Sequence, residues 1–403
     1  MRGKRRALII GGSMSGLLAG IMLDRHGWKV DIFERVEQEL AGRGAGIVAQ
    51  AELIARLNGL GLDTGNLGVA TTTRKILDRA GHITATLECP QVLTAWERVY
   101  RVLRDAFAPQ RYHRGAALRA FEQGADGVLA HFSDGSTAAA DVLIGADGLR
   151  STVRQQCAPE VVPLYAGYVA WRALIAERVI PPTIHRQMFM DMTFCLPPGE
   201  QCLGYPVAGP NNELRQGQRR YNVVWYRPAD EGSELPALLT DQTGIAHSIS
   251  IPPPLIRAEP IAAMRAAAER LLAPQFRDIV GLIDEPILQP IYDLESPQLA
   301  FGRIAVIGDA AFVARPHVAA GVSKAADDAA ALAAALDGDD VAAGLRRFEA
   351  ERLPDNRKII ERARHLGAYL QATQTAEERA RSARHSIPQA VLAETAVLDF
   401  LHA

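Results

Sequence analysis

The sequence has little of what marks several protein classes. It has four cysteines in 403 residues, with no CxxC pair and no zinc-type spacing. This argues against a disulfide framework and against a metal site, and it favours a reducing compartment, so we expect a cytoplasmic protein with scattered core thiols. No uncharged apolar run is long enough to span a bilayer. The net charge of −2 gives no reason to expect nucleic acid or an anionic membrane as a partner.

What remains is the composition of an ordinary globular protein, with 48% hydrophobic and 22% charged residues. The length allows two domains. The basic start "RGKRRALII" resembles an export signal, twin arginine included, but glycines and serines break the apolar stretch that follows. No small-residue cleavage site precedes Asp24 and Arg25, so we interpret the segment as basic residues before a first buried strand.

A glycine-rich turn lies between an expected strand and an expected helix. Residues 7–10 are an apolar run, and apolar residues recur at helical spacing from Leu17. The dinucleotide fingerprint requires glycine at the first, third and sixth positions of such a turn. Gly11 and Gly16 satisfy the first and sixth positions, whereas Ser13 replaces the third glycine. Serine is small, and its hydroxyl can donate to a phosphate oxygen, so the context predicts a nucleotide loop.

An acidic residue ends the next expected strand. Residues 30–33 are followed by Glu34, at the position where a carboxylate accepts hydrogen bonds from a ribose 2′-hydroxyl and repels a 2′-phosphate. The loop is therefore predicted to hold the adenosine of FAD or NAD and not that of NADP.

Two further motifs follow expected buried strands. "DVLIGADGLRSTVR", residues 141–154, contains Asp147 and Gly148, and it comes after a hairpin signal at Asp134-Gly135. "GRIAVIGDAAFVARPHVAAGVSKAADDAAALAAAL", residues 302–336, places Asp309 directly after a strand, then a proline-containing loop and an alanine-rich helix. Ligands bind at this end of the strands in open α/β sheets. Taken singly, each motif is also compatible with an ordinary turn.

Together, in this order, the motifs "GGSMSG", "IGADGLRSTVR", "YAGYVAWRAL" and "GDAAFVARPHVAAGVSKAADDA" resemble the class A flavoprotein monooxygenases. These are aromatic-ring hydroxylases built on the para-hydroxybenzoate hydroxylase fold. The resemblance extends from Ala7 to about Leu370. The forms of the third and fourth motifs are most similar to the subgroup of 2,6-dihydroxypyridine 3-monooxygenases, whose loop also reads Gly-Gly-Ser.

The resemblance implies FAD as cofactor, with NADH or NADPH as a transient co-substrate bound without a second nucleotide loop. The pyrophosphate would lie on the glycine turn, the ribose on Glu34, the ribityl chain or pyrophosphate near Asp309, and the isoalloxazine against the turn from Pro316 to Gly321. The implied cofactor-binding residues are Gly11, Gly12, Ser13, Ser15, Gly16, Glu34, Arg35, Arg43, Asp147, Gly148, Asp309, Pro316 and Gly321.

The sequence departs from the family pattern at two places. Phe312 stands where a histidine is usual, and Trp96 stands where an arginine is common, which leaves Arg98 and Arg101 as candidate substitutes. These departures affect the detailed flavin contacts.

The expected fold is α/β, with a Rossmann-like FAD-binding domain, an inserted antiparallel β-sheet substrate domain and C-terminal helices. The ranges 1–75, 97–160 and 286–370 would form the FAD-binding domain, 76–96 and 161–285 the substrate domain, and 371–403 a C-terminal helical segment. Strands are expected in "YAGYVAWRAL", "RQMFMDMTFCL", "QCLGYPVAG" and "RRYNVVWYRP", and helix breaks near Pro274, Pro354 and Pro388. The region from Leu345 to about Ala393 is interpreted as a solvated or dimer-packing helix with no catalytic part.

The expected activity is hydroxylation of a small electron-rich aromatic or N-heteroaromatic ring, such as a hydroxypyridine. In this family NAD(P)H reduces FAD, O₂ adds at flavin C4a, and the hydroperoxide transfers one oxygen. His317 and Tyr205 are candidate catalytic residues that bond or accept a phenolic proton. A flavoenzyme of the same fold acting on a larger molecule (an epoxidase or reductase) and a non-catalytic dinucleotide-binding protein remain alternatives; the tryptophan-rich motif that a halogenase needs is absent. A homodimer is also possible.

Overall fold

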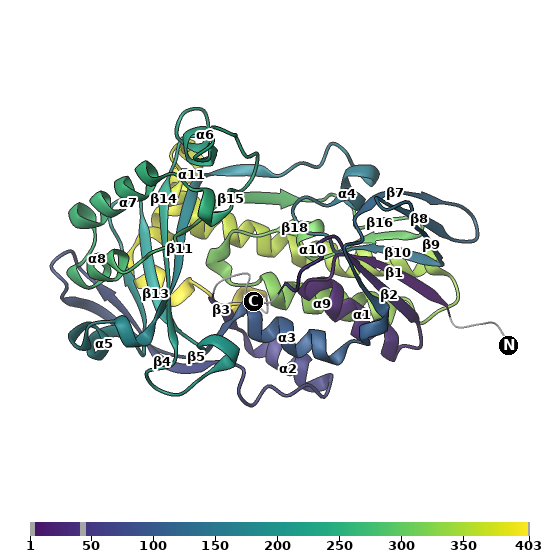
Figure 1. The fold of residues 1–403 in the computed structure, drawn as a ribbon, viewed down its shortest axis with the longest axis horizontal. Helices are drawn as coiled ribbons and strands as arrows, with labels where there is room; N and C mark the ends of the chain where they lie inside the picture. Colours follow the sequence, from purple (N-terminus) through teal and green to yellow (C-terminus); the bar gives the residue numbers. More distant parts are fainter. Residues whose placement is uncertain (1–4, 41–45, 402–403) are drawn as a thin grey trace.

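The computed structural model describes residues 5–40 and 46–401, so the expected cofactor residue Arg43 lies outside the described residues. A six-stranded sheet carries the nucleotide motifs (Figure 1). Five of its strands are parallel, and a short sixth is antiparallel at one edge. In spatial order they are β16 (Ala300–Phe301), β17 (Ile304–Val306), β10 (Val142–Gly145), β1 (Arg6–Ile10), β2 (Lys29–Glu34) and β6 (Tyr112–Arg114).

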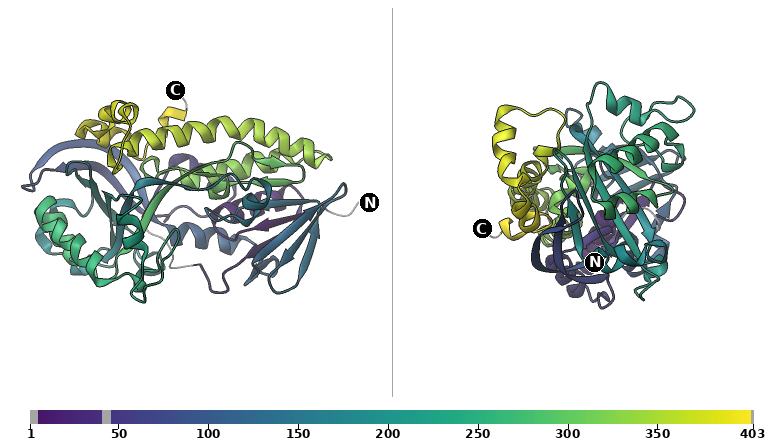
Figure 2. Two further views of the ribbon diagram at one scale, coloured as in Figure 1. Left: turned by 90° about the horizontal axis from the view of Figure 1, so that it is seen from above. Right: turned by 90° about the vertical axis from the view of Figure 1, so that its left-hand side faces the viewer.

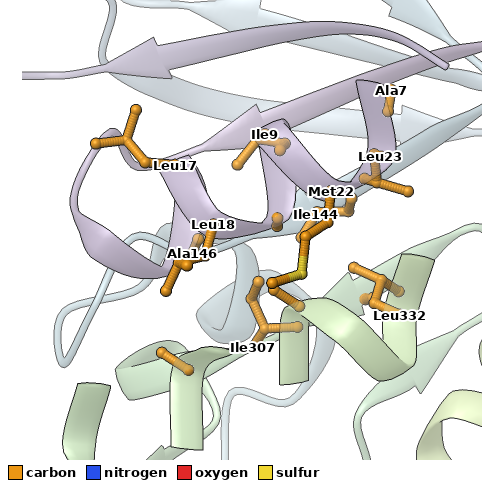
Figure 3. Close-up of a cluster of buried hydrophobic side chains, with 14 of the residues drawn as sticks. Ala7, Ile9, Leu17, Leu18, Met22, Leu23, Ile144, Ala146, Ile307 and Leu332 are labelled. Atoms are coloured by element: carbon orange, nitrogen blue, oxygen red, sulfur yellow. The ribbon is translucent and has the colours of Figure 1, made fainter. Parts of the chain in front are cut away.

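Helices cover one face of this sheet, whose central strands β1 and β10 are almost wholly apolar and buried. The helices on this side are α1 (Met14–Arg25), α2 (Ala51–Gly59), α3 (Trp96–Ala106) and α9 (Gly321–Ala335). Figure 3 shows Leu18 and Met22 of α1 packed beside Ile144 of β10 and Leu332 of α9. All four side chains are buried in the core of this half. A sheet of β7 (Leu118–Gln123), β8 (Val128–Phe132) and β9 (Thr137–Ala140) packs on the opposite face. There the Phe132 ring stacks on Phe33 at 4.4 Å between centroids. The predicted hairpin at Asp134-Gly135 joins β8 to β9 and is confirmed.

A nine-stranded sheet forms the second half of the molecule. All of its neighbouring strands pair antiparallel except β12 and β4, which are parallel. The order is β18 (Phe312–Val313), β15 (Ile287–Glu295), β11 (Leu164–Ala176), β14 (Arg220–Pro228), β13 (Gln201–Val207), β12 (Met192–Cys195), β4 (Val69–Leu77), β5 (Ile83–Ala95) and β3 (Gly46–Ala49). The large antiparallel sheet is thus present. The division of the chain into domains stays a prediction, and β3 and most of β4 pair in this sheet although they precede residue 76.

The two faces of the nine-stranded sheet have different environments because side chains alternate along each strand. Trp171 and Trp225 belong to the core cluster of the outer face. Helices cover this face of the sheet (Figure 1). These helices are α5 (Pro182–Met188), α6 (Glu234–Leu239), α7 (Ala258–Leu271) and α8 (Pro274–Gly281). Tyr168, Leu203 and Tyr226 belong to the inner face, which turns toward the nucleotide half.

The long helix α10 (Val341–Gly367) lies along both halves (Figure 2). The predicted break at Pro354 is wrong, because α10 continues through it. Pro354 and Ala350 are exposed, so water can satisfy the Ala350 carbonyl that proline leaves without its helical partner. The predicted interruptions near Pro274 and Pro388 are confirmed, because each proline begins a helix, α8 and α12 (Pro388–Glu394).

One predicted strand is only partly correct. In "RQMFMDMTFCL" the strand is limited to Met192–Cys195, because the preceding residues end helix α5, whose Ile184 and Met188 pack into the outer core. The two remaining helices are α4 (Thr152–Cys157) and α11 (Ala376–Ala383). All four cysteines are free, and Cys195 and Cys202 are buried. Within the ranges that the structure describes, no helix combines the length and the apolar character needed to cross a membrane.

Candidate active site

The glycine turn is packed too tightly for side chains. Gly11 has φ +107°, and a Cβ there would lie 2.3 Å from the Ala146 carbonyl oxygen. At Gly16 a Cβ would lie 1.9 Å from the Gly11 carbonyl oxygen. Ser13 occupies the N-cap position of α1, yet its side chain makes no capping hydrogen bond. The turn therefore leaves the N-terminus of α1 and the Ser13 hydroxyl available to an anionic group.

Glu34 supports the turn directly. Its carboxylate accepts the Gly12 N–H at 2.8 Å and the Val36 N–H at 2.9 Å, and the side chain is buried. A carboxylate has about four acceptor positions, so two backbone bonds leave capacity for ribose hydroxyls. Tyr112 donates its hydroxyl to the Gly12 carbonyl at 2.9 Å and fixes the other side of the turn.

A cavity of about 400 Å³ opens at the carboxyl ends of β1, β2 and β10. The expected residues that line it are Gly11, Ser13, Glu34, Arg35, Asp147 and Gly148. Arg35 is exposed there. The Asp147 carboxylate accepts the Thr152 and Val153 N–H groups at 2.7 and 3.2 Å, so it also caps α4, and burial raises its pKa.

Arg154, the last residue of the "DVLIGADGLRSTVR" motif, joins this cavity wall to the next motif. It is fully buried and donates to the Leu149 carbonyl at 2.7 Å and to the Ala310 carbonyl at 2.8 Å. The side chain therefore fixes the Asp-Gly loop relative to the turn that contains Asp309.

A second cavity, of about 300 Å³, lies between that turn and the inner face of the nine-stranded sheet. Sequence reasoning named five residues that the structure brings together here: Asp309, Pro316, His317, Gly321 and Tyr205. Ser15, by contrast, lies outside both cavities. Its hydroxyl packs against Gly308, where an added Cβ would lie only 2.1 Å from the Ser15 Oγ.

Asp309 presents a free carboxylate to this cavity. The side chain is accessible, and it makes no hydrogen bond with any described residue. Although the carboxylate is open to the cavity, the surrounding protein partly desolvates it and so raises the pKa of Asp309; the Asp328 carboxylate adds to this effect, while the Lys324 ammonium opposes it. Asp328 accepts the Gly308 N–H at 3.1 Å and the Arg352 guanidinium at 3.0 Å, and so holds the turn in place.

His317 lies in the cavity wall with its ring directed to Tyr168. Its Nε2 is 2.9 Å from the Tyr168 hydroxyl, and the side chain is 3% exposed. Burial, together with the Arg315 guanidinium, lowers the pKa of His317 to about 3. Arg315 itself is held by Asp293 through bonds of 2.8 to 3.2 Å. His317 is therefore neutral near pH 7, and the low pKa of its conjugate acid makes the imidazole a weak general base.

The lowered pKa of His317 predicts acid-sensitive stability. Between pH 6.5 and about 3 the unfolded chain binds a proton at this residue and the folded chain does not, so the free energy of unfolding falls as pH falls. The loss from this residue is about 1.4 kcal/mol per pH unit. Denaturant unfolding at pH 7 and pH 5 should show a smaller loss of stability in His317→Gln than in the parent. His82→Gln, at an exposed histidine, serves as the control. Equal losses in parent and His317→Gln would contradict a neutral buried imidazole.

The sheet side of the cavity contains residues that sequence reasoning did not select. Arg172 of β11 donates to Gln289 at 2.7 Å, and its Nε is buried without a hydrogen-bond partner. Burial raises the pKa of Tyr205 to about 12, and the nearby Arg172 cation opposes this rise. Burial also raises the pKa of Tyr226, again opposed by Arg172. Neither tyrosine hydroxyl bonds to a described residue. The sequence signal that could have identified Arg172 is its position as a charged residue inside the otherwise apolar strand "YAGYVAWRAL".

The two departures from the family pattern have different structural settings. Phe312 is fully buried and belongs to the apolar core beneath α1, so a hydrophobic side chain fits its position. Trp96 begins α3 and lines the cavity beside Glu34. Arg98 and Arg101 do not reach that cavity; they line a separate hollow with Arg220.

Residues near the C-terminus also reach the second cavity. Thr395 and Ala396 line its wall, and the Ala396 N–H donates to the His317 carbonyl at 2.7 Å. Both residues are buried, and they lie just beyond the range 345–393 that is interpreted as a solvated or dimer-packing helix. Their placement depends on a contact between distant parts of the chain, which no local pattern indicates.

Comparison with known proteins agrees with this geometry. A family described as FAD binding domain-like matches residues 165–293. The chain is 32% identical to 2,6-dihydroxypyridine 3-monooxygenase of Paenarthrobacter nicotinovorans over 91% of both proteins. It is 28% identical to 3-amino-4-hydroxybenzoate 2-monooxygenase of Streptomyces cremeus, over 90% of this chain and 86% of that protein.

Solved structures give the same result. The structure of 2,6-dihydroxypyridine-3-hydroxylase from Arthrobacter nicotinovorans superimposes with a TM-score of 0.86 at 31% identity, covering 92% of this chain and 93% of that one. HpxO of Klebsiella pneumoniae, complexed with FAD and uric acid, shares the fold at a TM-score of 0.77 and 23% identity, over 96% and 94% of the two chains. The protein binds FAD and belongs to the family of FAD-dependent aromatic hydroxylases, the class A flavoprotein monooxygenases.

Proposed function

We propose that this protein uses FAD, NAD(P)H and O₂ to hydroxylate a small, electron-rich aromatic or N-heteroaromatic ring, such as a hydroxypyridine. The observation that carries the proposal is the second cavity, which joins Asp309, Pro316 and Gly321 to Arg172 and Tyr205. About 300 Å³ has to accommodate the flavin ring edge and the substrate together, which favours a single small ring.

The residues present fit FAD. Gly11 and Gly16 leave no room for a side chain where the backbone has to approach a pyrophosphate, and the α1 N-terminus and Ser13 offer donors to it. Glu34 retains acceptor capacity for the ribose, and the free Asp309 carboxylate can accept ribityl hydroxyls. When bound and reduced by NAD(P)H, FAD supplies the activation of O₂ and the transfer of one oxygen atom.

Arg172 provides the electrostatic bias that this chemistry needs. Electrophilic oxygen transfer is favoured when the ring is electron-rich, most simply after loss of a phenolic proton. The Arg172 cation acts to lower the pKa of both Tyr205 and Tyr226, and it would favour the ionised form of a phenolic substrate in the same cavity for the same reason.

Tyr205 is assigned a hydrogen-bonding role toward the substrate, because its hydroxyl has no partner among the described residues and the residue lines the cavity. His317 is assigned a positioning role, since it is neutral and bonded to Tyr168. The named activities of the relatives, on 2,6-dihydroxypyridine and on 3-amino-4-hydroxybenzoate, involve small rings of this type.

The test is NADH and NADPH consumption by the purified flavoprotein with hydroxypyridines, hydroxybenzoates and purines, with mass spectrometry of the products. A hydroxylated single ring is the expected product. Arg172→Met should raise KM and divert reducing equivalents to hydrogen peroxide, and Tyr205→Phe should do so to a smaller extent, because a neutral hydrogen bond contributes only about 0.5–1.5 kcal/mol. Arg178→Met, at an exposed arginine just beyond β11, is the control. Turnover of large molecules only would contradict the proposal.

The cytoplasmic location and the homodimer remain expectations. The four free cysteines support a reducing compartment. Fractionation of the native host and sedimentation of the purified flavoprotein test the two expectations separately.

A further inference from the structure

A segment near the C-terminus, beyond the long helix α10, forms part of the wall of the second cavity. Residues 388–398, which comprise α12 and the turn after it, here called the 388–398 segment, lie against β4 and β5. Val391, Leu392 and Ala396 join the apolar cluster of the inner sheet face. Thr395 and Ala396 are 8% and 4% exposed, and both line the cavity that contains Tyr205 and His317.

Arg74 of β4 holds this segment from inside the protein. Its Nη1 donates to the Leu392 and Thr395 carbonyls, both at 2.6 Å, and its Nε donates to Gln91 at 3.0 Å. The side chain is 0% exposed, and it forms no ion pair with a carboxylate in the described residues. A buried guanidinium is costly to desolvate, so its placement against two carbonyls indicates a specific positioning contact.

Three further bonds converge on the turn after α12. The Ala396 N–H donates to the His317 carbonyl at 2.7 Å. The Ala396 carbonyl accepts hydrogen bonds from the side-chain amides of Gln50 and Gln91 at 3.1 and 3.4 Å. Ala396 has φ +55°, a conformation that non-glycine residues rarely adopt and that persists where the surroundings determine it. Hydrogen bonds to the loop that contains His317 and to Gln91 of β5 therefore fix this turn from two sides.

Thr395 offers a polar group in this wall. Its hydroxyl has no hydrogen bond with any described residue, whereas its carbonyl is taken by Arg74. A hydroxylated or nitrogen-containing ring in the cavity can supply the missing partner, since a hydroxyl both donates and accepts.

We propose that Thr395 contacts the aromatic substrate and helps to determine its specificity, and that Arg74 is the positioning residue that holds Thr395 and the 388–398 segment as the cavity wall. The substrate contact rests on the proposed function, whereas the wall itself does not. Water exclusion by this wall would keep oxygen transfer coupled to NAD(P)H oxidation.

The first experiment compares Arg74→Met with Lys75→Gln in the flavin-loaded protein. Lys75 is the next residue of β4; it pairs with Asp191 at 2.5 Å on the other side of the strand and is a matched control. Arg74→Met should increase iodide quenching of flavin fluorescence and tryptic cleavage in residues 376–398, with FAD content unchanged. Lys75→Gln should change neither. Unchanged quenching and cleavage in Arg74→Met overturn the wall, whether or not any ring is hydroxylated.

The second experiment concerns the substrate contact and uses 2,6-dihydroxypyridine as the probe. Thr395→Val keeps the shape of the side chain and removes the hydroxyl, so Kd measured from the flavin absorbance change should rise about two- to tenfold, with Thr395→Ser restoring it. Arg74→Met should raise KM more than it lowers kcat and increase hydrogen peroxide per NADH. Probe binding that is equal in Thr395→Val and parent overturns the contact, and so does the absence of any absorbance change with the parent. The absence of hydroxylated product from any ring, with probe binding and its Thr395 dependence intact, contradicts the proposed function alone.

Discussion

Replacing Gly11 by alanine is expected to abolish FAD retention. A Cβ would lie 2.3 Å from the Ala146 carbonyl oxygen and 2.8 Å from the Asp147 Cα, and both are backbone atoms that cannot turn aside. The residue also has φ +107°, which adds strain on the order of 1–3 kcal/mol for any side chain. Relief requires the turn to move away from the end of β10, which destroys the donor geometry at the start of α1. Because every 1.4 kcal/mol is a factor of ten, we expect a loss of about a hundredfold or more in FAD affinity.

The measurement is flavin content after purification, followed by titration of the apoprotein with FAD. Gly59→Ala is the matched control, since Gly59 in α2 has open space around it and should leave FAD binding and thermal stability nearly unchanged. Ser13→Gly should also retain FAD, because glycine is the usual residue of the fingerprint at that position. Circular dichroism separates loss of binding from loss of folding. A folded Gly11→Ala protein that keeps its flavin would show that the turn does not contact the pyrophosphate.

Replacing Asp309 by alanine is expected to weaken FAD binding about tenfold to a hundredfold. A hydrogen bond to a charged group contributes roughly 1.5–3 kcal/mol. The Asp309 carboxylate lines the second cavity and has no hydrogen bond with any described residue. The turn itself should survive, because Asp328 and Arg154 hold it through the Gly308 N–H and the Ala310 carbonyl. The loss of affinity should therefore occur without a matching loss of thermal stability in the apoprotein.

Isothermal titration of apoprotein with FAD gives the affinity directly. Asp327→Ala is the control, because Asp327 lies on α9 and pairs at the surface with Arg56 at 3.0 Å. Asp309→Asn keeps an acceptor and should fall between parent and alanine. If Asp309→Ala binds FAD like the parent, the carboxylate does not contact the ribityl chain, and its position at the turn has another purpose.

The parts of the site that the sequence predicted are those encoded locally. Gly11, Glu34, Asp147 and Asp309 each lie at the carboxyl end of a strand or within three residues of it, and parallel strands bring their carboxyl ends to one edge. The placement of Asp309 and His317 in one cavity with Tyr205 also agrees with prediction. Their individual roles remain predictions.

The parts that the sequence did not predict depend on long-range pairing. Arg172 reaches the cavity because β11 pairs with β14 and β15, which begin far along the chain, and Thr395 does so because Arg74 binds its carbonyl. Pro354 misled the helix prediction because solvent exposure, which decides whether its missing bond is costly, is not visible in one sequence. Local patterns identify the strand ends, and tertiary contacts decide which other side chains join them.

Alternation along the strands of the nine-stranded sheet has an evolutionary consequence. On β11 Arg172 faces the cavity while Trp171 and Ala173 face the outer core, and on β13 Tyr205 lines the cavity while Cys202 belongs to the outer core. A mutation at an inward position can therefore change the chemical character of the cavity without removing a contact under the outer helices. Neutral drift and selection then act on two nearly independent sets of residues carried by the same strands. This separation allows single substitutions at inward positions to alter the cavity while the packing of the outer core stays unchanged.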